Sequence, residues 1–209
     1  MNQHLFGASI VIVALSFTAC SEAPKPETKT DAEAKKEAPK PTGPVSGKTA
    51  FYEMYKPARS WAVDLLPLSL TSNEVEGIKS EDGKYAMWTA VFVSPSKHEA
   101  RTFTYAIADQ GTTVRRGVTM GGAESWSGAT PKSKPFQTTE LAVDSDAAYK
   151  TALEKAQAWV KKHPDKTPAL FLGSSNRFPA PAWYVLWGNT KLGYAVFVNA
   201  TTGAVMTGK

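Results

Sequence analysis

The sequence predicts an α+β protein of two tandem small modules, each with one helix packed on a short antiparallel β-sheet. Three observations predict this fold class. Residues 182–206 read as short apolar strands separated by tight turns. An amphipathic helix precedes them, between residues 144 and 164. A weaker copy of the same order, helix and then strands, occupies the first half of the 209-residue chain.

The C-terminal strands are expected to form an antiparallel meander. Trp183, Val185 and Trp187 alternate with two further apolar residues, the period of a strand with both faces at least partly covered. Turns with glycine follow at residues 188–193 and 199–203. The apolar face of this meander requires a cover, which the preceding helix can supply.

The helix of the second half has clear ends and one apolar stripe. Asp144 can cap its first turn, and Pro164 stops it. We expect Trp159 to pack on the sheet beside Trp183 or Trp187. The stripe, at i, i+3, i+4 and i+7 spacing, consists of Tyr149, Ala152, Leu153, Ala156, Trp159 and Val160.

The first half repeats this order in a less regular form. Its helix is expected at about residues 48–64, where Pro57 should kink or split it. Its stripe consists of Phe51, Met54, Tyr55, Ala58 and Ala62. The matching strand segments are 68–72 with 170–174, 86–92 with 181–187, and 105–107 with 194–197.

The second half resembles a PepSY domain, a fold of the cystatin-like kind. The resemblance rests on the helix opening at 144–148, on Trp183-Tyr184-Val185, and on the V-N-A-T-T-G turn at 198–203. It covers residues 142–206 well and 48–118 weakly. PepSY domains are secreted or envelope modules, so the resemblance implies a binding or inhibitory role without catalysis by the domain itself.

The N-terminus reads as a targeting segment. Residues 5–17 are a nearly unbroken apolar run, too short to cross a bilayer core as a helix. The following Thr18-Ala19-Cys20 resembles the lipobox of bacterial lipoproteins. This implies a signal peptide at 1–19, lipidation (palmitate) at Cys20 and, with Ser21 next, an outer membrane location facing the periplasm. Ordinary secretion with a structural cysteine and an uncut transmembrane anchor are the alternatives.

Composition sets the remaining boundaries. Residues 20–47 are rich in Ala, Pro, Lys, Glu and Thr and hold no aromatic residue, which predicts a disordered tether. The two modules are then assigned to residues 48–128 and 129–209. Cys20 is the one cysteine of the chain, so no intramolecular disulfide can form.

Few residue patterns in the sequence indicate a catalytic site, a metal site or a nucleic-acid-binding surface. The formal net charge is +5, but no Lys/Arg cluster interleaved with aromatics is present, so nucleic-acid binding is not expected. His98 and His163 lie in different halves, and no spacing suits a zinc site. Residues 122–128 lack the glycines of a nucleophile elbow. We therefore expect no metal, no cofactor and no enzyme.

One segment remains without a predicted structure. Residues 119–134 join the halves and follow no strand or helix period. Trp126 in this segment either fills the seam between the halves, which we expect, or forms a candidate partner contact with Arg115 and Arg116. An aromatic residue beside arginine is the usual composition of a binding hot spot.

These observations favour a lipid-anchored envelope protein that acts as a non-catalytic binding or inhibitory module for an envelope protein or peptide. Two alternatives stay open. The first is a small envelope hydrolase that uses carboxylates such as Glu81 and Asp82. The second is a structural or assembly factor of an envelope complex.

Overall fold

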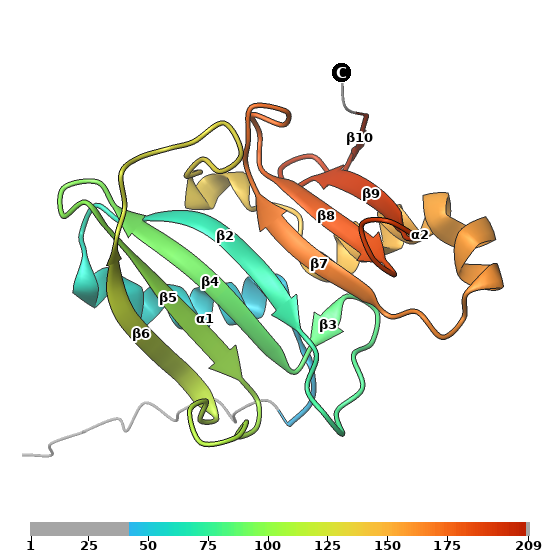
Figure 1. Cartoon of the computed structure of the whole chain (residues 1–209), viewed down its shortest axis with the longest axis horizontal. Coiled ribbons are helices and arrows are strands. Elements are labelled where there is room, and N and C mark those ends of the chain that lie inside the picture. Colours follow the sequence, from blue (N-terminus) through green and yellow to red (C-terminus); the bar gives the residue numbers. More distant parts are fainter. Residues whose placement is uncertain (1–41, 208–209) are drawn as a thin grey trace, which may run out of the picture. The chain divides into compact units, whose positions relative to one another are not determined.

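The computed structural model describes residues 42–207, which contain two long helices and a large antiparallel sheet (Figure 1). The first half consists of β1 (Val45–Ser46), α1 (Gly47–Trp61), β2 (Leu66–Asn73), β3 (Lys84–Tyr85), β4 (Met87–Ser94), β5 (Glu99–Ala106) and β6 (Gly117–Ser125). The second consists of the 3₁₀ turn η1 (Thr138–Glu140), α2 (Ser145–Lys162), β7 (Pro168–Gly173), β8 (Ala182–Trp187), β9 (Tyr194–Asn199) and β10 (Val205–Met206).

The predicted fold class is wrong: the described residues form a mostly β structure, and the two halves do not make separate modules with a small sheet each. Their strands form one eight-stranded antiparallel sheet in the order β10-β9-β8-β7-β2-β4-β5-β6. The two halves meet where β2 pairs with β7, with Leu70 opposite Leu172. Each half alone would leave the edge of its first strand unpaired, and pairing these two edges satisfies both rows of backbone groups.

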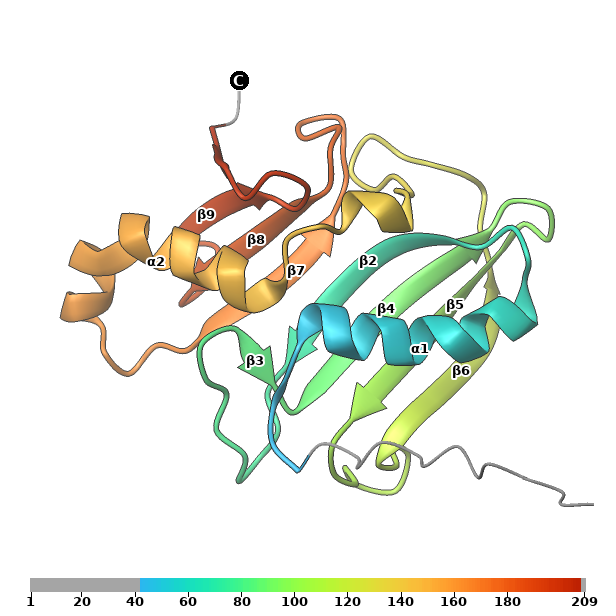
Figure 2. The same cartoon turned by 180° about the vertical axis from the view of Figure 1, so that it is seen from behind.

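Both helices lie on the same face of this sheet, as the two opposite views show (Figure 1, Figure 2). Helix α1 packs on β2, β4 and β5, and α2 packs on β8 and β9. The face under the helices is called the helix face here, and the other is called the open face. The order of one helix followed by four strands of the large sheet holds in both halves.

Helix α2 approaches the sheet through small residues. The fully buried positions of α2 are Ser145, Ala148, Ala152 and Ala156, one to each turn of the helix. Because these side chains are small, the helix axis can lie close to the bulky residues of the sheet. Helix α1 runs as one element through Pro57, so the expected split does not occur.

Tryptophans on the helix face fill the core between these layers. Trp88, Trp183 and Trp187 are essentially buried. Trp159 is only partly buried near the end of α2, where its ring lies 4.2 Å from that of His163. Trp159 therefore contributes less to the core than its place on the stripe predicts.

The starts of the two helices meet above this core. The backbone N–H of Gly47 donates to Oγ of Ser145 at 2.7 Å. One carboxylate oxygen of Asp144 accepts from the backbone N–H groups of both Lys48 and Ser145. Asp144 thus serves the first turn of both helices, an arrangement that fixes the N-terminus of α1 to that of α2.

Candidate functional site

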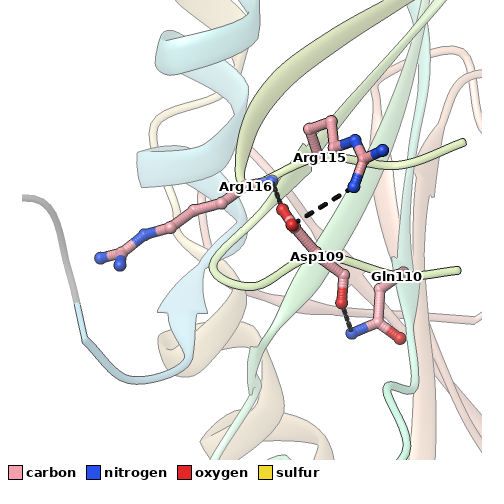
Figure 3. A network of polar contacts seen from close by, with 4 residues as sticks. All are labelled: Asp109, Gln110, Arg115 and Arg116. Carbon is pink, nitrogen blue, oxygen red and sulfur yellow. Dashed lines mark hydrogen bonds and ion pairs between the residues drawn. The ribbon is translucent and has the colours of Figure 1, made fainter. Parts of the chain in front are cut away.

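Arg115 and Arg116, the predicted partner contacts, lie in the turn that leads into β6 (Figure 3). Asp109 organises this turn. Its carboxylate accepts from the backbone N–H of Arg116 at 2.8 Å and lies 3.5 Å from a guanidinium nitrogen of Arg115. Both arginines are exposed.

Trp126 lies directly after β6, at the other end of that strand. Its backbone N–H donates to the carbonyl of His98 at 2.8 Å, and its side chain is half-buried. The nine residues of β6 separate Arg116 from Trp126, a span of roughly 30 Å. One copy of the chain therefore does not bring the three predicted contact residues together.

The expectation that Trp126 fills the seam between the halves is wrong. The seam is the β2–β7 pair, and β6 is the outermost strand of the sheet, beyond β4 and β5. Phe136 is the aromatic residue of the linker that lies at the seam. It is buried, and its backbone N–H donates to the carbonyl of Pro67 on β2. Trp88 and Trp183 form a T-shaped pair near this seam, with ring centroids 6.2 Å apart.

The open face carries a continuous row of side chains across the whole sheet. The pairing register places one residue of each strand in this row. The row crosses from apolar to hydroxyl side chains at the seam. Its members, from β10 to β6, are Met206, Phe197, Tyr184, Phe171, Thr71, Thr89, Thr104 and Thr119.

The apolar half of this row is extended by a loop. Tyr184 and Phe197 stack with centroids 4.8 Å apart, and Phe178 of the β7–β8 loop lies 4.6 Å from Phe197. The guanidinium of Arg177 lies 5.1 Å from the rings of both Phe178 and Phe197. The four rings of Phe171, Phe178, Tyr184 and Phe197 are called the aromatic cluster here.

Phe171 is the most accessible ring of the aromatic cluster. It is 42% exposed, although the residues on either side of it along β7 are fully buried under the helices. Its ring lies over Gly173, where a Cβ atom would come within 2.8 Å of it. Glycine at this position allows the ring to lie along the sheet surface.

Basic residues border the aromatic cluster. The loop that carries Arg177 is bound to the linker between the halves, because the N–H of Asn176 donates to the carbonyl of Pro131 and the N–H of Lys134 donates to the carbonyl of Ser174. The linker lysines 132 and 134 therefore belong to the same region of the surface as Arg177. This region combines apolar rings with positive charge.

Sequence reasoning did not identify this cluster, although a signal was present. Residues 170–172 are three consecutive apolar residues in one strand. Because side chains alternate between faces, Phe171 must lie on the face opposite to that of Leu170 and Leu172. An apolar residue on each face of an antiparallel strand indicates a second covered or binding surface.

The candidate carboxylates of a hydrolase, Glu81 and Asp82, lie in an exposed turn. Glu81 and Asp82 line a hollow of about 270 Å³ with Pro44 and Lys84. Asp82 adopts a positive φ of 48°, in the turn before β3. Within residues 42–207, no group of three or more His, Cys, Asp and Glu side chains could hold a metal ion.

Two ionisable side chains hold parts of the fold together. Asp64 accepts from the hydroxyl of Ser94 at 2.7 Å and from the N–H of Ser96 at 2.8 Å, which lowers the pKa of this carboxyl to about 2. Burial, with a smaller contribution from the charge of Glu74, raises the pKa of Tyr85 well above its ordinary value. The Tyr85 hydroxyl donates to the carbonyl of Pro168.

Cys20, the predicted lipidation site, lies outside the described residues, as do the signal peptide and most of the tether. In the part of the chain that the structure describes, neither helix has the length and hydropathy needed to cross a membrane.

Comparison with known proteins adds little. No protein-family model matches the chain, and no curated protein sequence matches it. The PepSY resemblance therefore stays a prediction. A solved structure from Clostridium difficile, of a protein provisionally assigned as a lipoprotein, aligns with 80% of this chain and 93% of its own length. Its sequence identity is 10% and its TM-score is 0.44, so we transfer no property from it.

Proposed function

We propose that this protein is a lipid-anchored binding protein of the bacterial cell envelope, and that the aromatic cluster on the open face is its partner-binding surface. The observation that carries the proposal is this cluster. It presents Phe171, Tyr184 and Phe197 on three adjacent strands, with Arg177 at its border.

The composition of the cluster suits protein or peptide binding. Aromatic side chains bury a large area with little loss of conformational freedom, and arginine with aromatic residues dominates interface hot spots. The ring of Phe171 is 42% exposed. A partner that covers it removes apolar area from water, and this burial stabilises the complex. The strands beneath are fixed by the tryptophan core, so the surface needs little reorganisation on binding.

Anchoring is proposed from the sequence. The apolar run that ends at Cys20 supports lipidation. Because Val45–Ser46 form β1 and α1 begins at Gly47, the tether predicted for residues 20–47 would connect the anchor to the folded part only as far as residue 44. If Cys20 carries the lipid, metabolic labelling with a fatty acid should label the wild-type chain, and Cys20→Ala should remove the label and the membrane association. A wild-type chain that takes up no lipid contradicts the anchoring.

The binding surface can be tested by site-specific photo-crosslinking in bacterial cells. A photoreactive residue at position 171 should give a discrete adduct with an envelope protein or peptide. The matched control places the same residue at Thr102, on the open face of β5 in the other half. Equal adducts at both positions, or none at position 171, contradict the proposal.

The two alternatives make different predictions. A hydrolase that uses the hollow at Glu81 and Asp82 would lose its activity in the Glu81→Gln, Asp82→Asn double variant, while adducts at position 171 would persist. An assembly factor would give the same adducts, but deleting its gene would reduce the amount of the complex rather than change a partner's activity.

A further inference from the structure

We propose that two copies of this chain associate through antiparallel pairing of their β6 strands. The pairing would extend the eight-stranded sheet across a two-fold axis. This surface is separate from the aromatic cluster, so the inference does not depend on the function proposed above.

The first observation is that the two edge strands of the sheet differ in length. One edge ends in β10, which has only two residues, and short edge strands are a common protection against unwanted pairing. The other edge is β6, with nine residues and the sequence GVTMGGAES. It contains no Lys and no Pro, two residues that often protect an edge strand, and its protective features are Glu124 near its end and the irregularity at Gly121 and Gly122.

The second observation is the apolar surface along this edge. Val118 and Met120 of β6 are 36% and 51% exposed. Both lie on the helix face, opposite Tyr105 and Phe103 of β5. Pairing of the backbone edge would bring a second set of the same side chains beside them and remove apolar area from water.

The third observation is that β6 is complementary to itself in the antiparallel direction. The pairing with β5 has an irregularity at Gly121 and Gly122, which reverses the alternation of faces beyond it. A two-fold axis between these glycines places Met120 opposite Ala123 of the second copy and Val118 opposite its Ser125. In every such pair both side chains lie on the same face of the sheet, as an antiparallel ladder requires.

The charges and the tryptophan at the ends of β6 agree with this register. The strand begins after Arg115 and Arg116 and ends with Glu124 and Trp126, so antiparallel pairing brings the basic end of one copy to the acidic end of the other. Trp126 of the second copy falls opposite Gly117, beside Arg115. The residues that one chain holds roughly 30 Å apart thus become neighbours at each end of the interface.

The register can be tested by disulfide cross-linking of the full chain in detergent. Cys20→Ala first removes the one native thiol. Val118→Cys combined with Ser125→Cys should give a covalent dimer on mild oxidation, since these positions face each other across the axis. Thr119→Cys combined with Ser125→Cys is the control, because its two side chains lie on opposite faces and should not cross-link.

The oligomeric state provides the independent measurement. Light scattering should give the mass of two chains for the wild type. Met120→Lys should raise the dissociation constant at least about tenfold, because it puts an ammonium group at the contact between the copies and beside the guanidinium of Arg101, which lies 3.4 Å from the sulfur of Met120. Phe171→Lys, which puts the same charge at a side chain of similar exposure on the other half, should leave the dimer intact. A wild-type chain that stays at the mass of one copy, a Met120→Lys variant that still dimerises as well, or equal cross-linking of both cysteine pairs would each overturn the proposal.

Discussion

The two halves of the sheet are alike under the helices and different on the open face. Under the helices, Trp88 and Trp183 occupy equivalent places on β4 and β8. Each donates its indole N–H to the carbonyl of a residue just before a helix, Val45 at 3.0 Å and Val143 at 2.9 Å. On the open face, the same transverse row holds four threonines in the first half and three aromatic rings with a methionine in the second.

This difference separates the demands of folding from those of function. Both halves must fix a helix on a sheet, and the same tryptophan contact does so in each. Threonine is an ordinary residue for a solvated sheet surface, because its branched side chain favours the strand and its hydroxyl suits water. Aromatic rings on that surface are not required by the fold, which is why we place the binding function in the second half.

The largest expected loss of stability is the same in both halves. Trp88→Ala and Trp183→Ala each remove a fully buried ring, and each should lower the free energy of unfolding by about 3–5 kcal/mol. Chemical denaturation would measure both. The control is Trp159→Ala, which should cost clearly less because that ring is only partly buried. A much smaller cost for one of the two core tryptophans would mean that the halves do not share one core.

The next effect concerns the point where the halves touch at their helix starts. A Cβ at Gly47 would lie 2.7 Å from the Trp183 ring, 3.1 Å from the Trp88 ring and 3.2 Å from Cβ of Ser145. Gly47→Ala should therefore destabilise the protein by about 1–3 kcal/mol through overpacking. The control is Gly122→Ala, where no atom lies within 4 Å. Similar melting temperatures for the two variants would contradict the tight contact.

Local patterns in the sequence predict the elements of each half, but not how the halves join. The helix caps and the strand periods are properties of neighbouring residues, so α2 begins after Asp144 and ends before Pro164 as expected. The pairing of β2 with β7 joins Leu70 to Leu172 across about 100 residues, and no local pattern specifies it. Two modules with free edges and one fused sheet have the same local sequence signals.

The candidate site, like the joining of the halves, could be predicted only in part from local sequence patterns. The position of Trp126 in the segment between the halves predicts that it fills the seam, yet residues 117–125 form an edge strand and carry it away from the seam. The two glycines and the mostly polar side chains of this strand hide its period. The aromatic cluster was recognisable only in part, since Phe171 indicated a second surface but its neighbours Tyr184 and Phe197 come from strands whose register the sequence does not give.

A smaller effect should appear when the contact between the halves at Tyr85 is broken. The Tyr85 hydroxyl of β3 donates to the carbonyl of Pro168, the first residue of β7, so Tyr85→Phe should cost about 1 kcal/mol. Burial raises the pKa of Tyr85 in the folded chain. As pH rises through about 10, the unfolded chain loses this proton first, so the stability should fall above that pH. This fall should be weaker in Tyr85→Phe, and an identical alkaline profile for both proteins would contradict the assignment.

The smallest effect on stability is expected where the two halves differ most. Phe171→Thr continues the threonine row of the first half by one strand into the second. Phe171 is 42% exposed, and threonine is a good strand former. The free energy of unfolding should therefore change by no more than about 0.5 kcal/mol, which the melting temperature would show. Binding of the envelope partner, measured by capture on the immobilised chain, should nevertheless fall, because a central ring of the aromatic cluster is lost. Thr104→Val, a nearly isosteric change in the same row of the other half, should alter neither quantity. If Phe171→Thr binds as the wild type does, the aromatic rings serve only to cover the sheet, and the contrast between the halves carries no function.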